Sequence, residues 1–428
     1  MGRANAKEGV HLMTENKKKK SISITMQILF ATVGGVLFGA LIGPWAGNLK
    51  FIGDIFIRLI QMSVVILVMS AVIGSVGSLK GKGLGRMGLN TFKWFIVFTV
   101  FAAVLGLALG EVIQPGSGIT LVDQSQITEP PPAASIQDTI LGFVSTNIIG
   151  SMAAGSMLPC IVFSLFFGLA ISKYSSLNQN SVILTVVNDL NAVILHVIQM
   201  VMKLAPIGIF CLLANVSGAI GFKVIIPMIK YLGSLAIGDA ILLIVYFSLA
   251  AVRCKVNPLV MPGKFAKMSL VALTTTSSAI SLPTKMEDSV IKFGISRRVS
   301  DFVGPLAMTM NSSGAALCYV VMTLFLAQSA GVVMNTHQLV MAVVLSCLLC
   351  MGTITVPGGS VVVCTFLAAS LGLPPDAIAL MLGVDWFAGM FRTLLNVDAD
   401  VIVAMLVANA EGELDRDVYN GKKVAEYV

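Results

Sequence analysis

The chain has 428 residues, of which 56% are hydrophobic and 11% are charged, and its formal net charge is +7. Soluble domains carry about 25% charged residues, so this composition excludes a soluble globular protein. A membrane-spanning helix needs about 20 apolar residues, and the chain contains several such runs. We therefore expect an all-α polytopic membrane protein. An outer-membrane β-barrel is excluded because the apolar runs are long rather than alternating.

Positive charge is concentrated in clusters along the chain. These clusters lie at residues 17–20, 80–86, 253–267 and 285–298. We place the last cluster, which begins with Lys285, in a loop beyond a helical hairpin, while the segments 114–137 and around His337 carry no Lys or Arg. This alternation is the positive-inside pattern of a multi-pass protein, here of the plasma membrane. It predicts that both termini are cytoplasmic, and it argues against nucleic acid as a partner.

The first 256 residues predict six of the eight transmembrane helices that we expect. The six apolar runs lie at about 22–45, 51–76, 88–113, 140–171, 182–218 and 224–252. In the first run, Gly35, Gly39 and Gly43 recur every fourth residue, a spacing that lets a neighbouring helix approach closely. The polar segments 1–21 and 411–428 are expected to be cytoplasmic tails.

Two later apolar stretches are cut in the middle by polar and helix-breaking residues. Residues 258–292 are interrupted at 274–283, where Pro283 ends the break, and residues 339–372 are interrupted at 353–360. Each arm is too short to cross a bilayer, so we expect two re-entrant helical hairpins. Their non-helical tips must be enclosed by protein or face a water-filled cavity.

The last two spans are also unusual. Residues 301–328 form an apolar run that is broken at 311–314, and residues 376–410 form a run that carries several charges. The order is therefore hairpin, broken helix, hairpin and polar helix. Such an order is typical of an inverted repeat that surrounds a binding site near the membrane midplane.

The charged part of the final run reads GVDWFAGMFRTLLNVDAD, residues 383–400. With about 100° per residue, one arc of about 100° collects six positions of a helix. These positions are Asp385, Gly389, Arg392, Thr393, Asn396 and Asp400. Only Asp398 points away. Because a charge at mid-bilayer costs at least about 2.5–3.5 kcal/mol, this face predicts a protein-enclosed site for a polar or charged ligand.

Other function classes fit the sequence less well. An ion channel would show a continuous polar stripe through several spans, whereas here polarity is concentrated in broken helices. The chain has no H-E-x-x-H motif of a membrane enzyme and no G-x-x-x-x-G-K-[ST] motif of an ATP-driven pump, so we expect no enzyme activity. The pair Cys347 and Cys350 is interpreted as packing, since no second pair accompanies it, and no cofactor is expected.

Four spaced motifs resemble signatures of the dicarboxylate/amino acid:cation symporter family. They are TTTSSAISLP (274–283), MTMNSSGAAL (308–317), GTITVPGGS (352–360) and GVDWFAGMFRTLLNVDAD (383–400). The runs 157–171 and 202–210 are similar to the family's fourth and fifth spans. The likeness covers about residues 22–414, and four motifs in the same order make it specific.

The resemblance implies a homotrimer of elevator-type transporters in the lipid bilayer. Residues 22–256 would mostly form a scaffold, with the third and sixth helices joining the moving part. Residues 257–410 would form the transport core. The implied function is secondary active symport, in which entry of sodium, of protons or of both drives uptake of a small carboxylate. That substrate would be a C4-dicarboxylate or an acidic or neutral amino acid.

The resemblance also implies roles for individual residues. Arg392 would pair with a substrate carboxylate, Thr393 and Asn396 would contact its other polar end, and Asp385 would orient Arg392. The residues that would close over the substrate are Ser277, Ser278, Val356, Pro357, Gly358 and Gly359. A single sodium ion would be held by Asn311, Asn396 and Asp400.

Several positions depart from the family pattern. Gly389 stands where amino-acid transporters have an aspartate for the ammonium group of the substrate, which favours a C4-dicarboxylate such as succinate. Ser313 replaces an ion-binding aspartate, and Phe95 and Phe98 replace an ion-binding Tyr and Thr, although Thr99 keeps a hydroxyl. These losses predict fewer coupled sodium ions, or a proton in place of one.

Simpler interpretations remain for the same residues. One interpretation of Arg392 is a buried arginine that is merely paired with Asp385, and one of Asp400 is a polar residue that assists helix packing. The corresponding interpretation of Ser277 and Ser278 is that they satisfy the backbone at a bend. The alternative function is a degenerate family member with reduced or no coupling, acting as an anion conductor or as a sensor.

Overall fold

The computed structural model describes residues 24–78, 85–118, 141, 144–154, 157–178, 181–350, 359–373 and 378–425. These residues are helical or in turns, and their one β-bridge pairs Ile295 with Leu414. This part of the chain confirms the all-α expectation.

The first part of the chain folds into long apolar helices joined by short turns. These are α1 (Ile24–Ile42), η1 (Gly43–Leu49), α2 (Lys50–Gln61), α3 (Val64–Gly77), α4 (Arg86–Ile113), α6 (Ile148–Ala153), α7 (Met157–Leu177), α8 (Ile183–Met202), α9 (Ala205–Ile220), η3 (Gly221–Val224) and α10 (Ile225–Cys254). Three predicted spans are each divided into two helices. The second divides at Met62–Ser63, the fourth between α6 and α7, and the fifth at Lys203–Leu204, where Pro206 then opens α9.

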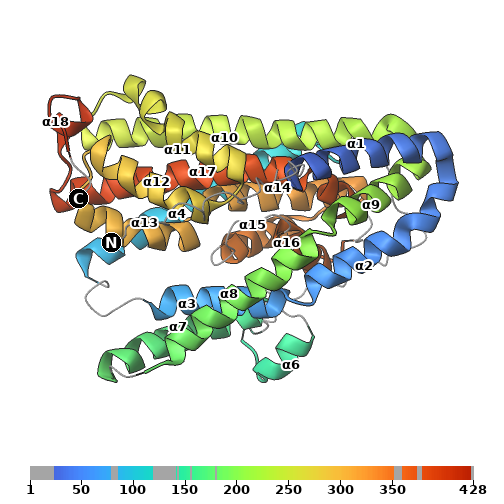
Figure 1. Ribbon diagram of the computed structural model, residues 1–428, viewed down its shortest axis with the longest axis horizontal. Helices are drawn as coiled ribbons and strands as arrows, with labels where there is room; N and C mark the ends of the chain where they lie inside the picture. The colour runs from blue at the N-terminus through green and yellow to red at the C-terminus, as the bar shows by residue number, and fades with distance from the viewer. Residues whose placement is uncertain are drawn as a thin grey trace, which may run out of the picture.

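The second part holds the elements that carry the motifs. These are η4 (Pro258–Val260), α11 (Met261–Thr275), α12 (Ser278–Ile291), α13 (Arg297–Met310), α14 (Ser313–Ser329), α15 (Thr336–Cys350), α16 (Gly359–Ser370), α17 (Ile378–Glu411) and α18 (Arg416–Tyr419). Figure 1 shows α10, α14 and α17 running along the long axis of the molecule, while α3, α7 and α8 form a separate group below them.

Six helical stretches in the described ranges are long and apolar enough to cross a membrane. They are 26–56, 86–113, 159–177, 183–201, 221–254 and 297–329. Helix α14, the second part of the segment 297–329, is buried at nearly all of its positions, so it lies at the centre of the helix packing. At about 1.5 Å per residue, α17 is also long enough to cross, but it carries charged residues.

The predicted break in the first hairpin is narrower than expected. Helix α11 ends at Thr276, whose φ is +49°, and the Ser277 hydroxyl oxygen accepts a hydrogen bond from the Ile280 N–H at 3.4 Å. Helix α12 then passes through Pro283, so the expectation that Pro283 belongs to the break was wrong. A proline in a helix removes one backbone hydrogen bond, and α12 continues beyond it.

The break in the 301–328 run falls where the sequence places it, but it is shorter. Between α13 and α14, Asn311 and Ser312 leave the helical conformation, and Ser313 already begins α14. The break predicted at 353–360 lies mostly outside the described ranges, which omit residues 351–358, and its last two residues belong to α16. Helix α17 runs unbroken from Ile378 to Glu411, so its polar positions stay in helical register.

Small residues allow α1 and α9 to pack closely. A Cβ added to Gly35 would contact the backbone of Phe210, and one added to Gly39 would overlap the Ala214 carbonyl oxygen and the Ser217 hydroxyl. Gly43 was expected to pack in the same way, but it has a φ of +72° and an added Cβ would meet nothing within 4 Å. Gly43 instead allows the turn into η1, since glycine adopts a positive φ without strain.

We expect Gly39→Ala to destabilise the protein by about 1–3 kcal/mol, because the new methyl group must push α1 away from α9. The measurement is the thermal unfolding temperature of purified protein in detergent. Gly233→Ala in α10 is the matched control, since a Cβ there meets nothing within 4 Å. Equal unfolding temperatures for the two variants would contradict the close packing.

Candidate functional site

The polar face predicted for α17 is buried inside the protein. Residue exposure is 3% for Arg392, 0% for Thr393, 3% for Asn396 and 2% for Asp400. The Asp385 side chain is 11% exposed. The structure therefore brings together on one buried helix the side chains that the sequence placed on one face.

Arg392 has few partners for a buried guanidinium. Its Nη1 lies 4.0 Å from Asp385 Oδ1, which is too long for a hydrogen bond. Within the described ranges, Nε and Nη1 have no hydrogen-bond partner. The same Asp385 oxygen accepts a hydrogen bond from the Ser360 hydroxyl, so Asp385 also ties α16 to α17. A buried arginine with free donors is a favourable place for an anion.

The tip of the first hairpin reaches this arginine. A Cβ placed on Gly389 would lie 3.7 Å from Arg392 Nη2 and 3.9 Å from the Thr276 side chain. These are ordinary contact distances, so the hairpin tip and the guanidinium both lie directly beside the glycine, with room for one methyl group between them. Of the two predicted tip serines, Ser277 caps α12, and Ser278 is 1% exposed.

The break between α13 and α14 packs directly on α17. The Gly314 N–H donates a hydrogen bond to Asn396 Oδ1 at 2.8 Å. A Cβ on Gly314 would overlap the Arg392 carbonyl oxygen, so a larger residue is excluded there. Asn396 thus uses its amide oxygen to bind the start of α14, and its predicted role as a sodium or substrate ligand stays a prediction.

Asp400 is paired with a lysine that we expected in a surface loop. Lys285 Nζ lies 2.6 Å from Asp400 Oδ2, and the two side chains are 2% and 1% exposed. The ammonium also donates to the Gly304 carbonyl oxygen at 3.1 Å, and Asn311 Nδ2 donates to Asp400 Oδ1 at 2.9 Å. The assignment of Lys285 to a positive-inside loop was therefore wrong.

The sequence gives little sign of this buried lysine. Lys285 precedes Glu287 and Asp288, which resemble the start of a polar loop. The hairpin arm instead continues as α12 to Ile291, and its first turns lie against α13 and α17. Helix α12 extends further than the composition suggests, so Lys285 lies on a helix in the protein interior and not in a loop.

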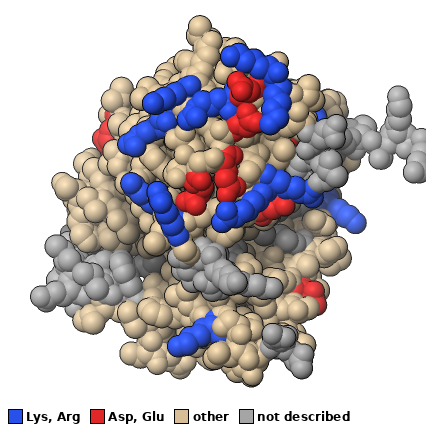
Figure 2. All heavy atoms as spheres, turned by 90° about the vertical axis from the view of Figure 1, so that its left-hand side faces the viewer, with Lys and Arg blue, Asp and Glu red and all other residues tan. Residues whose placement is uncertain are grey.

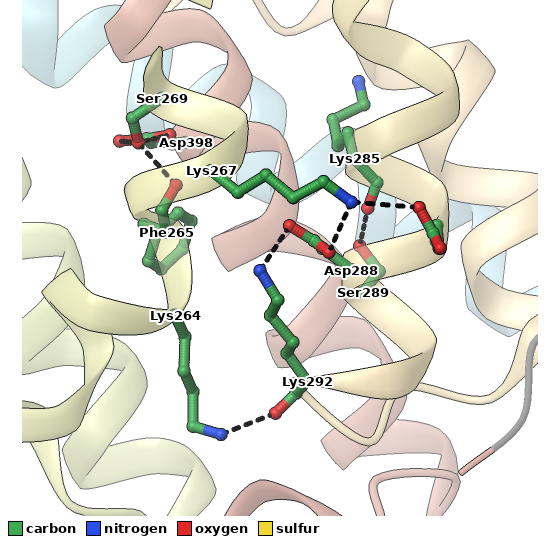
Figure 3. A network of polar contacts seen from close by, with 10 residues as sticks. Lys264, Phe265, Lys267, Ser269, Lys285, Asp288, Ser289, Lys292 and Asp398 are labelled. Atoms are coloured by element: carbon green, nitrogen blue, oxygen red, sulfur yellow. Dashed lines mark hydrogen bonds and ion pairs between the residues drawn. The ribbon is translucent and has the colours of Figure 1, made fainter. Parts of the chain in front are cut away.

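Asp398 belongs to a different face of α17, as the helical periodicity predicts. The Ser269 hydroxyl of α11 lies 2.8 Å and 2.9 Å from its two carboxylate oxygens (Figure 3). The residue is 2% exposed. Asp398 therefore holds the first hairpin against α17 and takes no part in the polar stripe.

One end of the molecule is rich in charged side chains of both signs (Figure 2). Here Lys267 lies 3.2 Å from Glu287 and 3.8 Å from Asp288, and Lys292 lies 2.9 Å from Asp288. Figure 3 shows the lysines beside Asp288. Lys267 and Glu287 are 52% and 44% exposed, so their charges lie at the protein surface, whereas the Asp288 side chain is 0% exposed.

Comparison with known proteins decides the family. The family model of the sodium:dicarboxylate symporter family matches residues 24–410. The chain is 32% identical over 418 residues to the proton/glutamate-aspartate symporter of Escherichia coli (strain K12), covering 93% of this chain and 95% of that protein. The chain belongs to the sodium:dicarboxylate symporter family. This family consists of transporters and not of enzymes, as expected.

Two further relatives differ in their substrates. The chain is 32% identical over 411 residues to the proton/sodium-glutamate symport protein of Bacillus subtilis (strain 168), covering 92% of this chain and 94% of that protein. It is 27% identical over 413 residues to the C4-dicarboxylate transport protein of Rhizobium etli, covering 94% and 92%. The family therefore includes transporters named for amino acids and for dicarboxylates.

The positions that depart from the family pattern are packed as hydrophobic core. Phe95 and Phe98 of α4 are each 1% exposed, and the Phe98 ring stacks on Tyr246 of α10 with centroids 3.9 Å apart. Ser313 is 0% exposed and its hydroxyl has no hydrogen-bond partner among the described residues. Aromatic rings thus lie at the two positions of α4 where the resemblance implies ion-binding side chains, and the loss of a cation site stays a prediction.

The remaining predicted site residues belong to the expected second hairpin tip and to α17. Val356, Pro357 and Gly358 lie outside the described residues, and Gly359 begins α16. Thr393 is buried, and its hydroxyl has no hydrogen-bond partner within the described ranges. Its predicted contact with a substrate stays a prediction.

We expect Lys285→Met to lower the free energy of unfolding by about 3–5 kcal/mol, because the Asp400 carboxylate stays buried without its cation. Adding Asp400→Asn removes the second charge and should recover most of this loss. Unfolding of the purified variants is measured in choline buffer. Lys267→Met is the control, since that side chain is 52% exposed, and it should change the stability by less than about 1 kcal/mol. If the effects of Lys285→Met and Asp400→Asn on the free energy of unfolding were additive in the double variant, the two side chains would not form a stabilising pair.

Proposed function

We propose that this chain is a secondary active symporter that takes up a small carboxylate, with C4-dicarboxylates as its preferred class. The observation that carries the proposal is Arg392. It is 3% exposed, and two of its nitrogens lack hydrogen-bond partners among the described residues. A buried guanidinium with two nitrogens that lack acceptors is costly, and a bound carboxylate would supply the missing acceptors.

The simpler interpretation, a structural pair of Arg392 and Asp385, is less well supported. The two groups are 4.0 Å apart, and the nearer Asp385 oxygen is already bonded to Ser360. Asp385 lies close enough to attract the Arg392 guanidinium and influence its orientation, but it leaves the Nε and Nη1 donors of Arg392 without an acceptor among the described residues. This geometry supports a positioning role for Asp385 and a ligand-binding role for Arg392.

Gly389 supports the choice of substrate class. The relatives named above carry either acidic amino acids or C4-dicarboxylates, and both classes have two carboxylates. They differ in the ammonium group of the amino acid. Gly389 has no side chain to receive an ammonium group, and a Cβ placed there would have the Arg392 guanidinium and the Thr276 side chain as its nearest neighbours within 4 Å. A substrate without an ammonium group therefore suits the site better than an amino acid does.

The remaining architecture is proposed from the family and from the packing. We propose eight transmembrane helices, two re-entrant hairpins and a homotrimer, with residues 257–410 as the moving transport core. Helices α11, α12, α13 and α14 all pack on α17, which supports a single moving body. We place the charged end of Figure 2 and both termini in the cytoplasm, in agreement with the positive-inside pattern. Sodium, protons or both are the proposed coupling ions.

We expect Arg392→Ala to reduce concentrative uptake of labelled succinate into proteoliposomes at least about 100-fold, because a buried charge-assisted pair contributes about 1.5–3 kcal/mol or more. Arg392→Lys should stay well below wild type, since an ammonium cannot bind a carboxylate through two parallel donors.

The protein must be shown to be folded for this result to count. Unfolding temperatures and monodispersity are recorded for each variant, and Lys267→Met serves as a charge-removal control away from the site. Wild-type rates in Arg392→Ala would refute the proposed site. Equilibration without accumulation in wild type would instead favour the alternative of an uncoupled family member.

We expect Gly389→Asp to shift the preference from succinate toward aspartate by about 10-fold or more, because a new carboxylate would attract the ammonium group and repel a second substrate carboxylate. The ratio of uptake rates in a mixed-substrate assay measures the shift. Gly389→Asn has nearly the same shape without the charge and should leave the ratio closer to wild type. A wild type that accumulates aspartate without competition by succinate would contradict the substrate class.

A further inference from the structure

Lys285 places a positive charge at the one buried carboxylate that was expected to bind a coupling ion. Its Nζ lies 2.6 Å from Asp400 Oδ2 and 3.1 Å from the Gly304 carbonyl oxygen. The side chains of Lys285 and Asp400 are 2% and 1% exposed. Figure 3 shows the Lys285 side chain pointing away from the Lys267 and Lys292 ammonium groups, which both lie beside Asp288.

The groups around this ammonium are those that would bind an alkali cation. A carboxylate oxygen and a backbone carbonyl oxygen are hard ligands, the type preferred by small hard cations. Asn311 completes the arrangement by donating to the second oxygen of Asp400, which fixes the orientation of the carboxylate. The ammonium carries the same charge as a sodium ion and uses the same oxygens.

A simultaneous sodium ion at Asp400 is disfavoured on two grounds. The oxygen nearest to the ammonium is already engaged at 2.6 Å, and the other oxygen faces the N–H of Asn311. Two positive charges at about 4 Å would also repel each other strongly in a buried site. Occupation by lysine and occupation by sodium are therefore alternatives.

We propose that Lys285 determines ion specificity: its ammonium takes the place of a sodium ion at Asp400, so that this site binds no sodium. The consequence for ion coupling rests on the proposed symport function, whereas the absence of sodium binding at Asp400 does not depend on it. A tethered cation crosses the membrane and returns with the protein, so it transfers no net charge per cycle and draws no energy from a sodium gradient. The site keeps its positive charge but loses its sodium coupling.

The test is a double-mutant cycle read as sodium-specific stabilisation. The unfolding temperature of purified protein is measured in NaCl and in choline chloride at equal ionic strength, without substrate. The four proteins are wild type, Asp400→Asn, Lys285→Met and the double variant. Wild type and Asp400→Asn should show the same sodium response. Lys285→Met should gain a sodium-specific rise of about 5 °C, which the double variant should lose.

Two results would overturn the proposal. One is a sodium response in wild type that Asp400→Asn removes, because Asp400 would then bind sodium beside the lysine. The other is a Lys285→Met protein that gains no Asp400-dependent sodium response. Lys292→Met, which removes a lysine from the partly exposed pair with Asp288, is the matched control and should gain none. If Lys285→Met does not fold, Lys285→Gln replaces it, since its neutral amide carries an oxygen that can bind sodium.

Transport separates this inference from the proposed function. The measured quantity is the ratio of succinate uptake rates into proteoliposomes with and without sodium. If symport occurs as proposed, this ratio should be about 10-fold or more higher for Lys285→Met than for wild type. Absence of carboxylate uptake in wild type would refute the proposed function, while the unfolding temperatures would still decide whether Lys285 stands in for sodium.

Discussion

The packing of this protein depends on keeping the charges of α17 satisfied away from water. Four charged side chains lie on that helix between Asp385 and Asp400, and each must find a partner or be reserved for a ligand. Three carboxylates have found partners: Asp385 binds Ser360, Asp398 binds Ser269, and Asp400 binds Lys285. These three partners come from α16, α11 and α12. Helix α17 is therefore held by both hairpins through polar contacts.

The broken helices follow from the same constraint. A regular helix satisfies its own backbone and offers little to a neighbouring polar group. The break at Asn311–Ser312 frees the Gly314 N–H for Asn396 and positions the Asn311 amide against Asp400. The hairpin tip at Thr276 likewise brings a non-helical residue beside Gly389 and Arg392. The interruptions are thus placed where α17 needs partners.

The sequence predicted these elements unevenly, for identifiable reasons. Helix α4 and the break at Asn311 were predicted closely because hydropathy and the N-S-S-G run mark them directly. The polar face of α17 was predicted by periodicity alone, since the helix is unbroken. Lys285 was missed because whether a lysine is buried depends on how far its helix extends and on which charge lies opposite. The partner, Asp400, is 115 residues away in the chain, and no local pattern reveals that contact.

The charges of the site bear on which substrate it suits. Among the groups described here, Asp385 and Asp400 carry negative charge, and Arg392 and Lys285 carry positive charge, so the site is formally neutral before a ligand binds. An aspartate at position 389 would make it negative, and an aspartate there would suit a substrate with an ammonium group. The ammonium at Asp400 has the same charge as the sodium ion that we propose it replaces, so it leaves the charge balance unchanged, and glycine at 389 alone shifts that balance. A dianion requires more positive compensation than an amino acid with the same two carboxylates and an ammonium group, so the glycine supports the proposed preference for a dicarboxylate.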